Sequence, residues 1–465
     1  MPSFRAPDFG VSFPALFQSS NDGTLAAVRR SDRGARDAAH KLTRLSPTEH
    51  MRRANVYMTN RAFTEAREHW QALINSYPND PRVPEALLGM GRSYSQARDY
   101  SDAYATFDQL ARTYSSTKEG REGLNFSAAA LLRMGRPADA VARYIEYVDR
   151  VPNGERIDTA YLNVIDTYRE AGLPEQAIAW VARARQRFLG TPTESNAIFG
   201  RLRLDVAEGD WRHAVATADE LSRRGFQKGV LTTPAEVAYL RAFSLERMGN
   251  RREAFNAYLA IPDSPDSYYG WLASERLAGL SDTHNQNVIK ERTARVNSQI
   301  DSASELYPAP YRPTLLRAAK SRGLDPRFIL AVIRQESVFR PQAKSPAGAR
   351  GLLQLTIDAA QKYAAGARIN NLSERDLYRP ETSITVGAEY IGELARMFPN
   401  MLEAVAASYN GGEDNVARWV KRARHKDPGV LTAEIGFDET KTYVQRVMSN
   451  YRAYRQLYSA DLVRR

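Results

Sequence analysis

Cysteine is absent from the 465 residues of this chain, and histidine is scarce. Without cysteine the protein has no disulfide bonds, no thiolate nucleophile and no cysteine-based zinc site. The histidines show no metal-ligand spacing and form no H-E-x-x-H motif; they are His40, His50, His69, His213, His284 and His425. We therefore expect neither a metal nor any other cofactor.

The sequence also lacks a long apolar run. None approaches the roughly 18 consecutive apolar residues of a membrane-spanning helix, so we expect no transmembrane segment. The first residues, Met1 to Asp8, contain neither the charged start nor the apolar core of a secretory signal. With 43% hydrophobic and 26% charged residues, the composition is typical of soluble globular proteins, and the length predicts two or three domains.

Positive charge exceeds negative charge, because 65 Lys and Arg residues stand against 54 Asp and Glu residues, giving a net charge of +11. Such an excess favours a polyanionic partner. The long basic run with interleaved aromatic residues that is typical of nucleic-acid-binding proteins is missing, so we expect no nucleic-acid partner. We interpret the densest basic cluster, residues 421–426, as a solvated helix face.

A repeat with a period of 37 residues runs through the first half of the chain. Its markers are the alanines Ala66, Ala103, Ala140, Ala177 and Ala214, followed after 40 residues by Ala254. A glycine stands five residues before the last four alanines, at Gly135, Gly172, Gly209 and Gly249. Each unit predicts a helix, a glycine-containing turn and a second helix in which alanine permits close packing. Residues 46–260 thus resemble a tetratricopeptide-like array whose units stack around a shared core.

The flanking segments are less regular. Residues 1–45 show no clear periodicity, and we expect them to be partly disordered. Residues 261–304 form a linker region in our interpretation, because a turn signal at 262–267 is followed by a polar stretch at 281–304 that is typical of a linker or exposed loop. From residue 305 to residue 465, short segments punctuated by Gly and Pro predict a mostly helical domain.

One predicted helix in this last region carries a carboxyl group at the end of an apolar run. Asp325 provides the N-cap, Pro326 the first position, and residues 328–333 the apolar run that leads to Glu336. A carboxyl group held against apolar walls has a raised pKa, which suits it to general acid catalysis. On the helix alone, the alternative is a solvated glutamate at a helix end.

Four short motifs occur in order along the region. They are Arg334-Gln-Glu-Ser337, Ser345-x-x-Gly-Ala-x-Gly-Leu-Leu-Gln354, Ser408-Tyr-Asn-Gly-Gly412 and Glu439-Thr-x-x-Tyr-Val444. Together they closely resemble the catalytic domain of the soluble lytic murein transglycosylases, bacterial enzymes that cut the glycan strands of peptidoglycan. The resemblance is specific over residues 305–460. It implies an all-α protein in which a tetratricopeptide-like α-superhelix precedes a lysozyme-like catalytic domain at 305–465.

The resemblance also implies a mechanism with Glu336 as the catalytic residue. Glu336 would first act as a general acid toward the oxygen between N-acetylmuramic acid and N-acetylglucosamine. It would then act as a base toward the C6 hydroxyl of the muramic residue, giving a 1,6-anhydro end without consuming water. The likeness further assigns substrate-binding roles to Ser345, Gln354, Tyr409, Asn410 and Glu439.

Each of these roles has a structural alternative. Taken alone, Ser345 is typical of a turn or cap and Gln354 of a surface residue. Tyr409 and Asn410 resemble a pair that faces Glu336, and a carboxyl group would be a suitable partner for a buried tyrosine hydroxyl. Glu439 resembles a second, non-nucleophilic carboxylate. Leu353 stands where the family usually has methionine, which removes no group that the chemistry needs.

Two other functions remain open. A goose-type lysozyme would use water in place of the C6 hydroxyl, and a non-catalytic adaptor would bind peptidoglycan without cutting it. A pure binder has no need of an acid at an apolar helix end, so we prefer the enzyme. The expected partners are peptidoglycan glycan strands and a protein held by the helical repeats, and the expected location is the periplasm or cell envelope.

Overall fold

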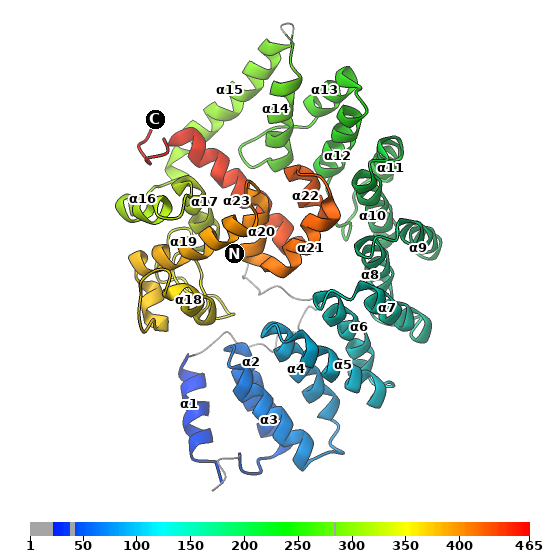
Figure 1. Ribbon diagram of the computed structural model, residues 1–465, viewed down its shortest axis with the longest axis vertical. Coiled ribbons are helices and arrows are strands. Elements are labelled where there is room, and N and C mark those ends of the chain that lie inside the picture. Colours follow the sequence, from blue (N-terminus) through cyan, green and yellow to red (C-terminus); the bar gives the residue numbers. More distant parts are fainter. Residues whose placement is uncertain (1–21, 38–41, 283–284) are drawn as a thin grey trace. The chain divides into compact units, whose positions relative to one another are not determined.

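The computed structural model describes residues 22–37, 42–282 and 285–465, and the secondary structure of this part of the chain consists of helices and isolated β-bridges (Figure 1). The expected all-α fold class is thereby confirmed. The chain divides into two compact units. Unit 1 contains the described residues up to Ala184 and the segment Ser345–Gly348, and unit 2 contains Arg185–Lys344 and Ala349–Arg465.

Unit 1 consists of successive helix pairs. Its helices are α1 (Asp22–Arg33), α2 (Pro47–Thr59), α3 (Phe63–Ser76), α4 (Val83–Gln96), α5 (Tyr100–Thr113), α6 (Lys118–Arg133), α7 (Pro137–Arg150), α8 (Ile157–Glu170) and α9 (Pro174–Arg187), the last of which continues into unit 2. The segments 1–21 and 38–41, which belong to the N-terminal stretch expected to be partly disordered, lie outside the described residues.

The repeat markers occupy the positions that the period predicts. Ala66, Ala103, Ala140 and Ala177 lie in the second helix of their pairs and are fully buried. Gly135 and Gly172 follow the first helices with a φ of 72° each, a left-handed conformation that glycine adopts without steric cost. Small residues at the helix crossings and glycines at the turns therefore explain the hairpin geometry of this unit.

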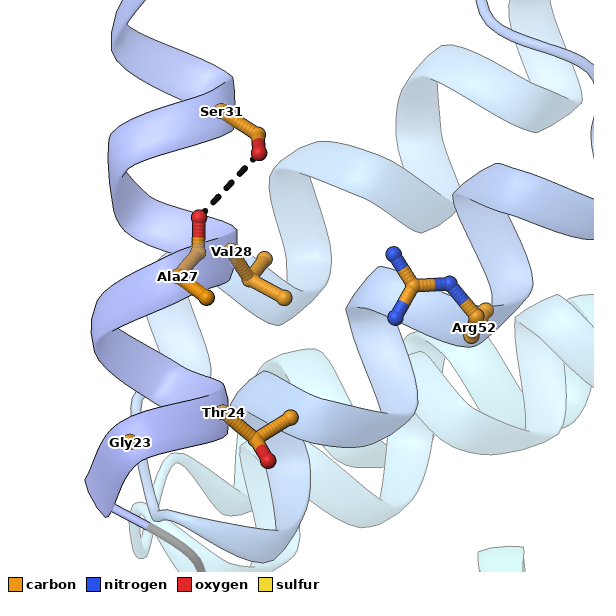
Figure 2. Close-up of a pocket in the computed structure, with 6 residues that line it drawn as sticks. All are labelled: Gly23, Thr24, Ala27, Val28, Ser31 and Arg52. Atoms are coloured by element: carbon orange, nitrogen blue, oxygen red, sulfur yellow. Dashed lines mark hydrogen bonds between the residues drawn. The ribbon is translucent and has the colours of Figure 1, made fainter.

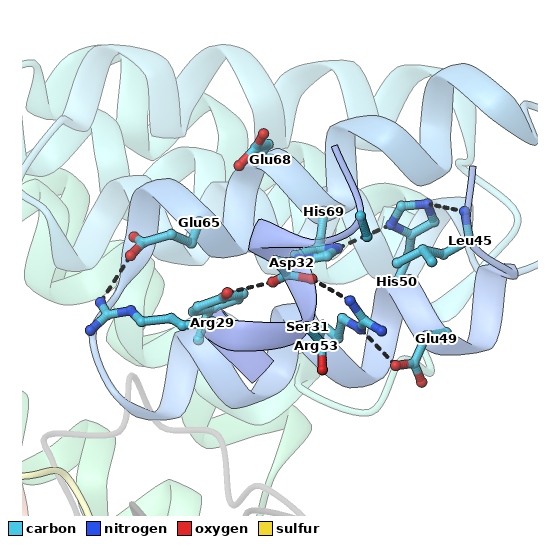
Figure 3. Close-up of polar contacts among 12 residues, drawn as sticks. Arg29, Ser31, Asp32, Leu45, Glu49, His50, Arg53, Glu65, Glu68 and His69 are labelled. Atoms are coloured by element: carbon cyan, nitrogen blue, oxygen red, sulfur yellow. Dashed lines mark hydrogen bonds and ion pairs between the residues drawn. The ribbon is translucent and has the colours of Figure 1, made fainter. Parts of the chain in front are cut away.

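Helix α1 is held to the repeats by a buried carboxylate (Figure 3). Asp32 is 4% exposed and accepts hydrogen bonds from Tyr57 and Arg53 of α2. Its Oδ2 also lies 3.0 Å from Nε2 of His69 in α3, and Nδ1 of His69 lies 3.1 Å from Nδ1 of His50. A charge at this depth requires several partners, and α2 and α3 supply them.

Unit 2 begins with further helices of the same kind. They are α10 (Pro192–Glu208), α11 (Trp211–Arg224), α12 (Pro234–Arg247), α13 (Arg251–Leu259), α14 (Tyr268–Leu280) and α15 (Gln286–Ser302). Ala214 and Ala254 are again fully buried, and Gly209 and Gly249 again have positive φ. Trp271 in α14 is a core residue, as expected.

The expectation of a linker or exposed loop at 281–304 is wrong for most of that segment, because Gln286–Ser302 forms α15. The helix buries one narrow stripe, made by Arg292, Val296 and Ile300 at a spacing of four residues, and exposes most of its other side chains. Such a stripe is enough for the helix to pack on one neighbour. Because most of its other side chains are polar, the amino-acid composition of the segment resembles that of a loop.

The C-terminal region is built from short helices and turns. It contains the 3₁₀-helices η1 (Ser304–Leu306) and η2 (Glu374–Tyr378) and the helices α16 (Arg312–Lys320), α17 (Pro326–Ser337), α18 (Ile357–Ala364), α19 (Pro380–Met397), α20 (Leu402–Gly411), α21 (Glu413–Ala423), α22 (Pro428–Glu434) and α23 (Asp438–Leu457). Helix α23 packs on both α17 and α20. In the described residues, no helix is long and apolar enough to cross a membrane.

The basic cluster 421–426 is not simply a solvated helix face. Arg422 is buried and donates to the backbone carbonyl of Glu434 at 2.9 Å. His425 lies 3.0 Å from the carbonyl oxygen of Val206 in α10 and contacts the ring of Trp211 in α11. Arg422 thus joins α21 to the following helix α22, and His425 joins the end of α21 to the preceding helices α10 and α11. Only the tertiary structure reveals these roles.

Candidate active site

Glu336 lies in the last turn of α17, where the helix changes from apolar to polar. The side chains 328–333 are at most 1% exposed, whereas Glu336 itself is half-buried. Asp325 caps the helix by accepting a hydrogen bond from the Arg327 N–H at 2.9 Å, and Pro326 follows as the first helical residue. The cap and the apolar run confirm the expected helix and explain how it delivers one carboxyl group to the edge of the core.

The carboxyl group of Glu336 has one well-defined partner, the hydroxyl of Tyr443 on α23, which donates to Oε1 at 2.7 Å. Burial raises the pKa of Glu336 to about 8, the negative charge of Glu439 adds to the rise, and the hydrogen bond from Tyr443 opposes it. A carboxyl group with this pKa is mostly protonated at neutral pH. It can therefore act as a general acid.

Glu439 lies in the first turn of α23 and is exposed. The negative charge of Glu439 adds to the rise in the pKa of Glu336. The role of Glu439 as a second, non-nucleophilic carboxylate stays a prediction.

The backbone immediately after Glu336 is strained. Val338 and Phe339 both adopt left-handed conformations, with φ values of 49° and 58°. For a β-branched residue such as Val338 this conformation is costly, and such outliers are concentrated at functional sites. The two residues end α17 abruptly and turn the chain into the segment that carries Gln354.

Gln354 closes a tight turn. Its amide nitrogen donates to the carbonyl oxygens of Ala343 and Gly351, at 3.0 Å and 2.9 Å. Gly351 has a φ of 78°, and a Cβ atom there would lie 1.9 Å from the carbonyl oxygen of Leu377. Only glycine fits this position, so the Gly-Leu-Leu-Gln motif specifies a backbone shape as well as a side chain.

Tyr409 and Asn410 both lie at the end of α20, beside the site. The hydroxyl of Tyr409 donates to the carbonyl oxygen of Leu353 at 2.6 Å, and not to a carboxyl group. Burial and the nearby charge of Glu336 raise the pKa of Tyr409 well above its ordinary value. Asn410 accepts a hydrogen bond from the Thr440 hydroxyl at 2.6 Å. Tyr409 thus supports the Gln354 turn, and Asn410 ties α20 to α23.

Ser345 belongs to the segment Ser345–Gly348, which is grouped with unit 1. Its carbonyl oxygen accepts a hydrogen bond from the Gly348 N–H at 3.0 Å in a turn. This conformation agrees with the turn serine that the sequence allows as an alternative. A glycan contact by Ser345 stays a prediction.

Tyr443 is the residue whose role the sequence did not disclose. It was visible as part of the Glu439-Thr-x-x-Tyr-Val444 motif, but no function followed from the motif alone. The available signal was its spacing of four residues from Glu439, which places both side chains on neighbouring turns of one helix face.

A concave region lies in unit 1, beside α1 (Figure 2). It has a volume of about 370 Å³ and is lined by Gly23, Thr24, Ala27, Val28, Ser31 and Arg52. The Ser31 hydroxyl donates to its own helix, at the Ala27 carbonyl oxygen, and Arg52 is the ionisable group of this lining. It therefore lacks the acid that the end of α17 provides. Among the described residues, no group of three His, Asp or Glu side chains could hold a metal ion.

Comparison with known proteins finds two family matches within the chain. Residues 314–431 match the family described as Transglycosylase SLT domain, and residues 85–117 match a tetratricopeptide repeat family. The soluble lytic murein transglycosylase of Escherichia coli K12 is 31% identical over 163 residues, which are 35% of this chain and 25% of that protein. The chain thus spans about a quarter of the length of the soluble lytic murein transglycosylases it matches.

Solved structures agree over most of the chain. An inactive mutant of a lytic transglycosylase from Pseudomonas aeruginosa matches with a TM-score of 0.53 and 20% identity, covering 93% of this chain and 84% of that one. The 70-kDa soluble lytic transglycosylase of Escherichia coli matches with a TM-score of 0.50 and 18% identity, covering 95% and 87%. At these identities the similarity establishes a shared fold, which is the helical-repeat and lysozyme-like fold expected from the sequence.

Proposed function

The chain carries a transglycosylase SLT domain at residues 314–431 and resembles the soluble lytic murein transglycosylases, and from this premise we propose that it cleaves the glycan strands of peptidoglycan. The observation that carries the proposal is the state of Glu336. It is a half-buried carboxyl group with a pKa of about 8, and it accepts a hydrogen bond from Tyr443. A group that is protonated at neutral pH at the edge of an apolar helix is suited to donate a proton to a glycosidic oxygen.

In the first step, Glu336 gives its proton to the oxygen that joins N-acetylmuramic acid to N-acetylglucosamine. The bond between that oxygen and C1 of the muramic residue breaks, and the protonated oxygen leaves with the glucosamine. The acetamido group of the substrate supports the positive charge that develops at C1. Tyr443 stabilises the carboxylate that Glu336 becomes, because its hydroxyl already donates to Oε1.

In the second step, the deprotonated Glu336 acts as a base. It takes the proton of the C6 hydroxyl of the muramic residue, and the C6 oxygen forms a bond to C1. The product is a 1,6-anhydro sugar, water is not consumed, and Glu336 is protonated again. One carboxyl group can fill both roles because the first step leaves it as a base.

The other site residues are proposed to bind the sugar. Gln354 uses its amide nitrogen to hold its own turn, so its amide oxygen is the atom suited to accept a hydrogen bond from substrate. Asn410 lies at the end of α20, next to Tyr409, and Glu439 supplies an exposed carboxylate at the start of α23. Ser345 is assigned a contact near the reacting sugar by resemblance.

The test is mass spectrometry of the products formed from purified peptidoglycan sacculi by the wild type and by Glu336→Gln. We expect fragments ending in 1,6-anhydro-N-acetylmuramic acid from the wild type, and a loss of roughly 10²–10⁴-fold in the variant. The matched control is Glu403→Gln, which removes a different buried carboxyl group whose pKa is raised by burial to about 7. Its cleavage rate should stay close to that of the wild type.

Other outcomes identify the alternatives. Reducing ends in place of anhydro ends would mean that water attacks C1, as in a goose-type lysozyme. Binding to sacculi without any new ends would mean a non-catalytic adaptor. Because the proposed substrate is part of the cell wall, we place the protein in the cell envelope.

A further inference from the structure

Helix α23 carries two residues that contact the site, and a third that contacts a different part of the molecule. Tyr443 donates to Glu336 on α17, and Thr440 donates to α20. Lys441 lies between them in sequence, yet its ammonium group reaches Glu236 of α12 at 3.0 Å. The helix that places a hydroxyl on the candidate acid is therefore tied to a helix that precedes the SLT domain.

The contact between Lys441 and Glu236 is withdrawn from water, since the two side chains are 8% and 0% exposed. Oε1 of Glu236 also accepts a hydrogen bond from Tyr269 at 2.9 Å, and Oε2 accepts one from Thr232 at 2.7 Å. Lys441 donates in addition to the carbonyl oxygen of Leu231 at 3.3 Å. Both charges are thus fully partnered, which a buried ion pair requires.

A second ion pair acts on the same helix. Arg452 donates to both carboxylate oxygens of Asp263, at 2.7 Å and 2.9 Å, and the Asp263 side chain is fully buried. Arg452 lies about three helical turns after Lys441, which returns it to the same face of α23. Two fixed points on one face determine both the position of a helix along its axis and its rotation about that axis.

Buried ion pairs contribute little net stability compared with apolar residues of the same size, but their geometry is directional. We propose that Glu236 is a positioning residue of the active site: by holding Lys441 it fixes the rotation of α23, and with it the hydrogen bond from Tyr443 to Glu336. A small rotation of α23 displaces the hydroxyl of Tyr443 because that group lies at the end of a long side chain. The catalytic consequence rests on the proposed function, whereas the effect on the carboxyl group of Glu336 does not.

The first variant is Glu236→Gln in the full chain, with the Glu336 carboxyl titrated by carbon-13 NMR of glutamate-labelled protein. The carboxyl signal of Glu336 is identified as the one that is missing from the spectrum of Glu336→Gln. Loss of the hydrogen bond from Tyr443 should move the titration midpoint upward by roughly one pH unit, as in Tyr443→Phe. Removal of the negative charge of Glu236 would by itself move the midpoint downward, so the sign separates repositioning from direct electrostatics. We expect kcat on glycan strands to fall about 10-fold, with KM nearly unchanged.

A double variant separates positioning from stability. Glu236→Gln leaves the ammonium of Lys441 buried without its counter-ion, and adding Lys441→Met removes that charge. We expect the double variant to regain thermal stability but to keep the shifted midpoint and the reduced kcat. The matched control is Glu208→Gln, which breaks the exposed ion pair with Arg424 and should change neither quantity.

Two results would overturn the proposal. One is an unchanged midpoint and an unchanged kcat in folded Glu236→Gln protein. The other is a double variant in which the titration midpoint, kcat and thermal stability all return to the wild-type values. That result would mean that the single variant is affected only by its buried unpaired charge. If the wild type makes no anhydro ends while the midpoint still shifts in Glu236→Gln, then the proposed function fails and the positioning role stands.

Discussion

Apolar walls and one tyrosine hydroxyl determine the protonation state of Glu336. The folded protein holds a proton on this group up to a pH of about 8, whereas an unhindered glutamate loses it near its ordinary value of 4.5. The stability linked to this proton is therefore full below about pH 4.5 and is lost as the pH rises through 8. The chain thus keeps the candidate acid in a state that weakens the fold at alkaline pH.

Glu336→Gln should consequently stabilise the protein, and increasingly so at higher pH. Since the side chain is half-buried, solvent screening reduces the effect, and we expect the free energy of unfolding to exceed that of the wild type by about 2 kcal/mol at pH 8. Near pH 4.5 the difference should disappear. Denaturant unfolding at the two pH values measures it, with the exposed Glu208→Gln as control. A gain of equal size at both pH values would mean that deprotonation of Glu336 is not its cause.

The sequence is informative about Glu336 and less so about its partner. The apolar run of 328–333 and the cap at Asp325 predict a helix that ends on the carboxyl group, and the structure confirms that helix. For the hydroxyl partner the sequence favours Tyr409, but Tyr443 makes the contact. The choice depends on how α23 packs on α17, and no local pattern encodes that packing.

At the scale of elements, α1 is the helix whose attachment depends most on a single buried charge. Asp32 is its central contact, and two outer ion pairs join Arg29 to Glu65 and Arg36 to Glu68. Burial lowers the pKa of His69, and burial together with the neighbouring His69 lowers the pKa of His50 to about 4.

Acid should therefore detach α1 from α2 and α3. Because the pKa of His50 is depressed, its contribution to stability is complete above its ordinary value of 6.5 and is lost as the pH falls toward 4. The pKa of Asp32 is also lowered, so its contribution is lost in the same direction at still lower pH. Hydrogen exchange, corrected for the intrinsic pH dependence, should show the amides of α1 losing protection between pH 7 and 4.5.

Helix α6 in the same unit serves as the internal reference, since it lacks this cluster, and its protection should change much less. Asp32→Asn should reproduce the acid behaviour at pH 7, because it removes the charge that Arg53 and Tyr57 bind. Equal loss of protection in α1 and α6 would contradict a local cause.

Elements with strong periodicity are predictable from the sequence, and those with weak signals are not. The buried alanines and the positive-φ glycines indicate the repeat pairs directly. Alanine is small enough for close helix packing, and glycine adopts the left-handed turn without steric cost. Helix α15 is not predicted from the sequence, because its buried stripe consists only of Arg292, Val296 and Ile300 and gives a weak helical pattern. The contacts of Arg422 and His425 are equally hidden, because the groups that they contact lie outside the basic cluster.

At the scale of the whole molecule, the compact units do not divide the chain at 304/305, the boundary expected for the catalytic domain. Several charged side chains after residue 305 are buried against partners that precede it. The pairs are Glu403 with Tyr268, Asp427 with Tyr239, Lys441 with Glu236 and Arg452 with Asp263.

A fragment of residues 305–465 should therefore be much less stable than a fragment of residues 185–465. Each buried polar or charged group that loses its partner costs about 1–3 kcal/mol, so we expect the melting temperature of the shorter fragment to be lower by at least about 10 °C. Circular dichroism of both fragments during heating measures the difference. Melting temperatures within about two or three degrees of each other would show that the pairs contribute little.

The two ion pairs of α23 also have a consequence for genetic recombination within this protein. A genetic crossover between α15 and α16 would separate Lys441 from Glu236 and Arg452 from Asp263 in a single event. A recombinant between diverged relatives would then keep these ion pairs only if both partners had retained matching charges. The two ion pairs thereby favour joint inheritance of the helices before and after this boundary.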